Sequence, residues 1–232
     1  MIRSGVVARL AVRELWITFR VFAVIGAFVA AGAVVALVPA PLPTLAGRLA
    51  AGLGVGSLAA AAVAAWSIAT ERRRGRAGWL IGHSVRRATL LAGWFAALAA
   101  VAMTGLAAAA ALGWLAASSV TLRLEPAGYL ALVGAVGTAT LAAIAVGLLA
   151  GTLLRPRPAI LVAVGACLLA AAVARFGPID PALVPGGAHV ALAGLREASP
   201  SAALGIRAAG VGLAVTGAVL VLALSAMERA EL

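Results

Sequence analysis

The sequence has no lysine, no asparagine and no glutamine, and it contains only one cysteine and two histidines among its 232 residues. Without lysine, the chain cannot form the nucleotide-binding P-loop G-x-x-x-x-G-K-[ST] or a lysine Schiff base. The single Cys167 excludes an internal disulfide and a cysteine metal cluster. The sequence also lacks the H-E-x-x-H metal motif and the G-x-S-x-G nucleophile motif. We therefore expect no catalytic residues, no cofactor and no metal site, and we expect that the chain is not an enzyme.

Charged residues are scarce as well. They make up 11% of the chain, whereas 64% of the residues are hydrophobic and the mean hydropathy is +1.14. A soluble domain carries about 25% charged residues, so this composition excludes a soluble globular protein. A membrane-spanning helix needs about 20 apolar residues, and we identify six charge-free stretches as candidates: 21–38, 49–69, 88–117, 127–154, 159–174 and 208–227. We predict an all-α polytopic membrane protein with six transmembrane helices, forming a single domain over residues 1–232.

All 18 basic residues are arginines, and their distribution predicts an orientation. With six spans both termini share one side, and that side also holds most of the arginines: Arg3, Arg9, Arg13, Arg20, Arg72, Arg73, Arg74, Arg76, Arg86, Arg87, Arg155, Arg157 and Arg229. The other side holds Arg48, Arg123, Arg175, Arg196 and Arg207. Because basic residues concentrate in cytoplasmic loops, we predict that both termini are cytoplasmic. The net charge of +11 then reflects topology beside a lipid bilayer, and we expect no nucleic-acid partner.

Residues 1–20 have the periodicity of a helix that lies along the inner leaflet. One stripe is basic (Arg9, Arg13 and Arg20), and the opposite stripe is apolar (Val7, Ala11 and Leu15). This pattern is typical of an interfacial amphipathic helix whose guanidinium groups face anionic headgroups. The alternative is an ordinary basic flank of the first span.

The predicted spans contain no Asp, Glu, Arg or His well inside them. Because such residues mark proton relays and ion pathways, their absence argues against a proton-coupled carrier, an ion pump and most intramembrane hydrolases. Two G-x-x-x-G pairs, Gly52 with Gly56 and Gly147 with Gly151, indicate close packing between helices.

The densest charge lies in residues 71–87, between the second and third predicted spans. Ala77, Leu80, Ile81 and Ser84 share one helical face there, and arginines occupy another. This pattern favours a short amphipathic helix with one face for a partner. The alternative is a solvated basic loop that only sets topology.

This segment resembles the first cytoplasmic loop of type-2 ABC exporter permeases. In that family a span ends in Glu, a basic run reaches Gly, an apolar helix follows, and a Pro-Val-Ser-Arg-like turn leads into Leu-Leu-x-Gly-Lys. The matching residues are Glu71, Arg74, Gly75, Trp79, Leu80, Val85 and Arg87, followed by Leu90-Leu91-Ala92-Gly93. Ser84 replaces the usual proline, and Trp94 replaces the usual lysine. The stretch 11–15 with Glu14, and Arg20 downstream, is similar to the interfacial helix of the family, and 228–232 is similar to its closing tail.

The resemblance implies partners and a mechanism. Two permease chains, identical or different, would form the path, and two cytosolic ABC ATPase subunits would bind below them. Residues 71–87 would form the coupling helix that rests in a cleft on the ATPase. The interfacial helix would carry Arg9, Arg13, Glu14 and Arg20, and residues 176–204 would form short re-entrant helices that close an outer gate, with Pro185 and His189.

Other functions remain open at this level. A haem-exporter-type permease of cytochrome c maturation has the same architecture, and nothing in the sequence identifies the cargo. A membrane scaffold or assembly subunit could also use the basic loop to hold a cytosolic partner. In each case we expect the plasma membrane of a bacterium as the location.

Overall fold

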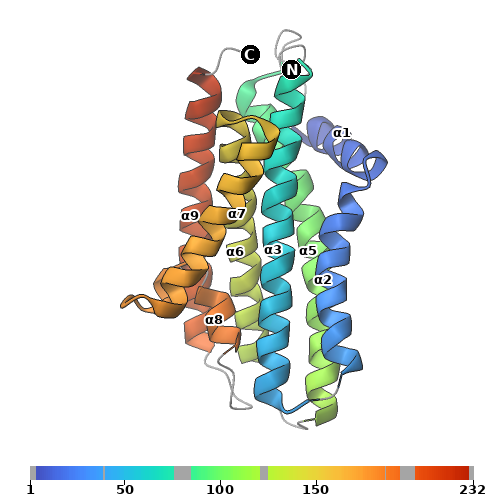
Figure 1. Ribbon diagram of the computed structural model, residues 1–232, viewed down its shortest axis with the longest axis vertical. Helices are drawn as coiled ribbons and strands as arrows, with labels where there is room; N and C mark the ends of the chain where they lie inside the picture. Colours follow the sequence, from blue (N-terminus) through green and yellow to red (C-terminus); the bar gives the residue numbers. More distant parts are fainter. Residues whose placement is uncertain are drawn as a thin grey trace.

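The computed structural model describes residues 4–38, 40–75, 85–120, 125–185, 187–193 and 202–229. These ranges contain helices and no strand (Figure 1). The helices are α1 (Ser4–Ile17), α2 (Arg20–Leu37), α3 (Leu42–Arg73), α5 (Arg87–Val120), α6 (Pro126–Leu153), α7 (Pro156–Phe176), the 3-10 helix η1 (Pro181–Leu183), α8 (Gly187–Ala193) and α9 (Ala202–Arg229).

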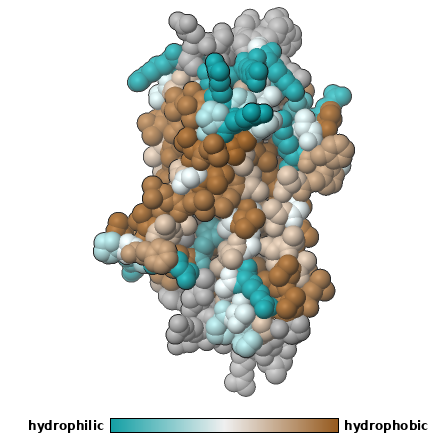
Figure 2. All heavy atoms as spheres, in the orientation of Figure 1, coloured by the Kyte–Doolittle hydropathy of each residue, from teal (hydrophilic) through white to brown (hydrophobic). Residues whose placement is uncertain are grey.

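Six of these helices are long and apolar enough to cross a membrane: α2, α3, α5, α6, α7 and α9. Each matches one of the six predicted spans, with two spans ending one residue beyond their helix, so the prediction of an all-α polytopic membrane protein is confirmed. Hydrophobic side chains cover the middle of the face shown in Figure 2, and hydrophilic side chains gather near its top. This band is the surface expected of a helical bundle whose solvent is lipid.

Helices α3 and α7 begin several residues before the charge-free stretches 49–69 and 159–174, and prolines lie in their first turns. Helix α3 begins at Leu42 with Pro43 in its first turn, so that Arg48 is helical. Helix α7 begins at Pro156, and Pro158 also lies in its first turn. Proline is tolerated at these positions because the first N–H groups of a helix have no intrahelical acceptor.

Helix α6 lies at the centre of the bundle, where it contacts α3, α5, α7, α8 and α9. Its contact with α3 depends on glycine. A Cβ atom added at Gly147 would lie 2.3 Å from the carbonyl oxygen of Ala61, and one at Gly151 would lie 2.6 Å from that of Ala65. The pair Gly52 and Gly56 packs in the same way against Ala31 and Phe28 of α2. Both predicted G-x-x-x-G pairs are therefore confirmed as packing sites.

The two ends of the bundle differ in charge. Helix α1 lies at the same end as the C-termini of α3, α6 and α9 and the N-termini of α5 and α7 (Figure 1). Among the described residues, the arginines near this end are Arg9, Arg13, Arg20, Arg72, Arg73, Arg74, Arg86, Arg87, Arg155, Arg157 and Arg229. Those near the other end are Arg48, Arg175 and Arg207. We call the two ends the arginine-rich end and the opposite end.

Candidate functional site

Helix α1 is separated from α2 by a sharp turn. Phe19 has φ 58°, in the left-handed region that is unusual for a residue with a side chain. Just before it, the Thr18 hydroxyl donates to the carbonyl oxygen of Glu14 at 2.7 Å. The turn places Arg20 at the start of α2. Arg20 therefore does not continue the basic stripe of Arg9 and Arg13. The prediction that all three arginines share one stripe was wrong for Arg20, because it assumed an unbroken helix.

The apolar stripe of α1 is buried, whereas Arg9 and Arg13 are exposed. Val7, Ala11 and Leu15 are at most 3% exposed, and α1 packs mainly on α5. At Gly93 of α5, an added Cβ would lie 2.5 Å from the Val7 side chain. The apolar stripe of α1 thus packs on protein, and the exposed faces of the helix carry hydrophobic side chains as well as the two arginines.

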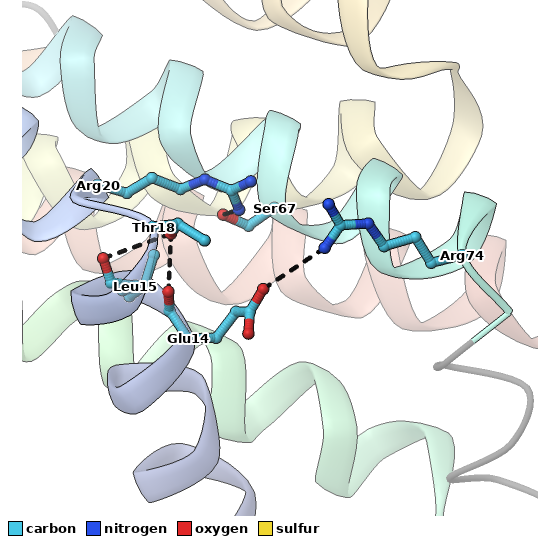
Figure 3. Close-up of polar contacts among 6 residues, drawn as sticks. All are labelled: Glu14, Leu15, Thr18, Arg20, Ser67 and Arg74. Carbon is cyan, nitrogen blue, oxygen red and sulfur yellow. Dashed lines mark hydrogen bonds and ion pairs between the residues drawn. The ribbon is translucent and has the colours of Figure 1, made fainter.

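Four charged residues from three helices lie close together at the arginine-rich end, and we call them the loop-root cluster: Glu14, Arg20, Glu71 and Arg74. The carboxylate of Glu14 lies 3.6 Å from the Arg74 guanidinium, and Arg20 donates to the Ser67 hydroxyl at 3.1 Å (Figure 3). Glu71 is 7% exposed, and it lies within electrostatic range of Arg20. The cluster joins α1, α2 and the C-terminus of α3 where the chain enters residues 76–84.

Two further arginines attach the flanks of this segment to other helices. Arg72 donates to the carbonyl oxygen of Gly151 at 3.3 Å and to that of Thr152. Arg87 donates to the carbonyl oxygen of Met227 at 2.8 Å and to that of Glu228. The last carbonyls of a helix have no intrahelical donor and carry the negative end of its dipole, so guanidinium groups stabilise them. Arg72 and Arg87 therefore bridge α3 to α6 and α5 to α9.

The structure thus brings together residues that the sequence placed in separate elements. Glu14 and Arg20 of the predicted interfacial helix meet Glu71 and Arg74 of the predicted coupling segment. Gly75 follows α3 with φ 70°. Val85 is buried. Trp79 and Leu80, with the rest of 76–84, lie outside the described residues.

Sequence reasoning missed the role of Arg72 and expected Arg87 to act toward a partner. For both arginines, the position in the sequence indicated a role at a helix end but did not identify the helix. An arginine at a helix boundary suits a nearby C-terminus, but the sequence cannot say which helix supplies it.

Pro185 and His189 lie elsewhere, at a cavity of about 470 Å³ between α3, α6, α7, α8 and α9. The Nε2 atom of His189 lies 3.4 Å from the Ser57 hydroxyl, which lies 2.8 Å from the hydroxyl of Thr140. Ser57 and Thr140 are 6% and 0% exposed, and both are near the middle of their helices. Among the described residues, no group of three or more His, Cys, Asp or Glu side chains could hold a metal ion.

Burial lowers the pKa of His189 to about 4, and a hydrogen bond with the backbone of Leu53 opposes this shift. The imidazole is therefore neutral at pH 7. Between about pH 6.5 and pH 4 the unfolded chain binds a proton at this residue that the folded chain does not. The contribution of the neutral His189 to the free energy of unfolding is fully present above pH 6.5 and decreases as the pH falls toward 4.

We expect the melting temperature of the detergent-solubilised protein to fall between pH 7 and pH 4.5, and to fall less in His189→Gln. The difference between the two proteins should be on the order of 5 °C. Protonation of the carboxylates changes the melting temperature of both proteins equally, so it does not contribute to the difference between them. If the melting temperatures of the two proteins fell equally with decreasing pH, His189 would not be a neutral, desolvated residue.

The fold defines the chain as an all-α polytopic membrane protein. No model of a known protein family matches the sequence, and neither does any curated protein.

Proposed function

We propose that the chain is the membrane-spanning permease subunit of an ATP-driven ABC exporter, acting as a dimer with two separate cytosolic ATPase subunits. The observation that carries this proposal is the loop-root cluster. It connects the C-terminal end of α3, which precedes residues 76–84 in the chain, to α1 and α2 through Glu14, Arg20, Glu71 and Arg74. A loop that only sets topology has no need of buried charge at its root, because burial of a carboxylate is costly unless it is paired.

The flanking arginines support the same function. A force applied to residues 76–84 by a partner would reach α6 through Arg72 and α9 through Arg87, because both guanidinium groups bond the ends of those helices. Helix α6 contacts five other helices. A movement of the end of α6 would therefore change its packing against these helices, because packed interfaces shift between discrete arrangements. Nucleotide binding and hydrolysis would occur on the partner, which is consistent with the missing lysine.

In this proposal the arginine-rich end faces the cytoplasm of a bacterium, with both termini on that side. The support is the unequal distribution of arginine between the two ends. Pro185 and His189 would then lie toward the external half of the bundle, where α8 packs on α3 and α6.

The proposal is tested by purifying the tagged chain from its own cells in a mild detergent and assaying the eluate for ATP hydrolysis. We expect an ATPase with Walker motifs to copurify in about equal amounts. A stable complex without any nucleotide-binding subunit would instead identify a membrane scaffold and overturn the proposal.

A further inference from the structure

The cavity beside His189 is elongated along the bundle. On α3 its lining extends from Gly47 to Leu58, and on α7 from Ala166 to Arg175. At 1.5 Å per helical residue, these stretches correspond to a length of roughly 15 Å. The cavity therefore runs from the opposite end of the bundle to about half its depth.

The walls of the cavity are apolar, and one side is open. Most lining residues are alanine, glycine, valine or leucine. Two of them, Val55 and Leu168, remain 57% and 52% exposed, because the cavity is open toward the outer surface of the bundle. Because that surface faces lipid in a membrane-spanning bundle, a molecule with a hydrocarbon chain can enter sideways from the bilayer. A volume of about 470 Å³ is within the range of small-molecule binding sites.

The charged and polar groups of the cavity are unequally placed. Arg175 lines it in the last turn of α7, near the opposite end, and its exposed guanidinium lies 5.7 Å from the centre of the Phe176 ring at the mouth of the cavity. No aspartate or glutamate is among the lining residues that the structure describes. His189 and Ser57 form a hydrogen-bonded part of the wall further in, and Thr140 supports Ser57 from behind. The cavity thus combines one permanent positive charge at its outer end with neutral walls.

We propose that this cavity binds a single-chain anionic amphiphile, with its acidic group on Arg175 and its hydrocarbon chain along the walls of α3, α6 and α7. The acidic group is a carboxylate or a phosphate, because both accept two parallel hydrogen bonds from a guanidinium. A cationic amphiphile would meet Arg175 without a compensating carboxylate, and it is excluded by like charge. The site does not depend on an ATPase, so it can be tested apart from the proposed function.

Two glycines provide a matched pair of variants. A Cβ added at Gly54 meets only the His189 ring, at 3.8 Å, so a leucine at this lining position extends into the cavity without a backbone clash. A Cβ added at Gly165 of α7 has no neighbour within 4 Å, and Gly165 does not line the cavity. Gly54→Leu therefore fills the site, and Gly165→Leu controls for the added apolar surface. Arg175→Ala removes the charge, and Arg207→Ala, at an exposed position of α9, is its control.

The experiment measures binding of 11-(dansylamino)undecanoic acid to the purified chain in phosphatidylcholine nanodiscs, with empty nanodiscs subtracted. We expect saturable binding that dodecanoate or dodecyl phosphate displaces and that dodecyltrimethylammonium does not. The stronger of the two anionic competitors identifies the acidic group. Gly54→Leu and Arg175→Ala should each weaken binding at least about tenfold, which is about 1.4 kcal/mol, and both control variants should bind like the wild type.

Three results would overturn the proposal. The first is an absence of saturable binding, including the case in which a second copy of the chain covers the open side. The second is equal binding by Gly54→Leu and Gly165→Leu. The third is displacement by the cationic competitor as effective as that by the anionic ones. None of these results depends on whether an ATPase copurifies.

Discussion

Replacing Gly147 by alanine should destabilise the folded protein by about 3 kcal/mol, the upper end of the usual cost of overpacking a core. The new methyl group would lie 2.3 Å from the Ala61 carbonyl oxygen and 2.8 Å from the Ala64 Cβ atom. A backbone oxygen cannot move aside as a flexible side chain can. Helices α3 and α6 would have to separate, and the small-residue contact that holds helices together in lipid would be lost.

The control for this substitution is Gly134→Ala on the same helix, where an added Cβ has no neighbour within 4 Å. We expect it to remain within about 1 kcal/mol of the wild type, because it changes only helix propensity. The measurement is the fraction of monodisperse protein in detergent after heating, followed by size-exclusion chromatography. Similar midpoints for Gly147→Ala and Gly134→Ala would show that α3 and α6 do not pack as closely as described.

The second large effect is expected from Glu71→Gln, and it rests on the proposed function. The substitution keeps the shape of the side chain and removes its charge beside Arg20 in the loop-root cluster. The start of segment 76–84 would lose a buried electrostatic contact, and breaking one side of such a contact is costly because the remaining charge is uncompensated. We expect the rate of ATP hydrolysis in the purified complex to fall at least tenfold, which corresponds to about 1.4 kcal/mol of activation free energy.

Insertion of the chain into the membrane should be unaffected, because Glu71 lies at the end of α3 and its removal makes the helix no more polar. Glu125→Gln is the matched control, since Glu125 is an exposed glutamate immediately before α6. Wild-type ATP hydrolysis in Glu71→Gln, with equal amounts of both chains, would remove Glu71 from the coupling element. Trp79→Ala should also uncouple the complex, because the resemblance places Trp79 at the ATPase surface.

The same residues show how far local sequence patterns extend. The apolar stripe of Val7, Ala11 and Leu15 was predictable because side chains three and four apart share a helix face. The position of Arg20 was not, because a single left-handed residue, Phe19, changes the direction of the chain. The dense charge of residues 71–87 indicated in the sequence that this loop differs from the others. The sequence could not show that Glu14, from another element, pairs with Arg74.

Composition and periodicity by themselves determined that this is a six-span helical membrane protein with arginine concentrated at one end. These properties depend on residues that are near neighbours along the chain, and on the cost of placing polar groups in lipid. The tertiary structure alone decided which helix ends Arg72 and Arg87 bond, and that His189 reaches Ser57, which is 132 residues away along the chain. Contacts of this kind depend on how the helices pack in three dimensions, because each polar side chain has several chemically equivalent partners in the sequence. For the same reason the cavity beside His189 has no local sequence pattern, since five helices from different parts of the chain contribute its walls.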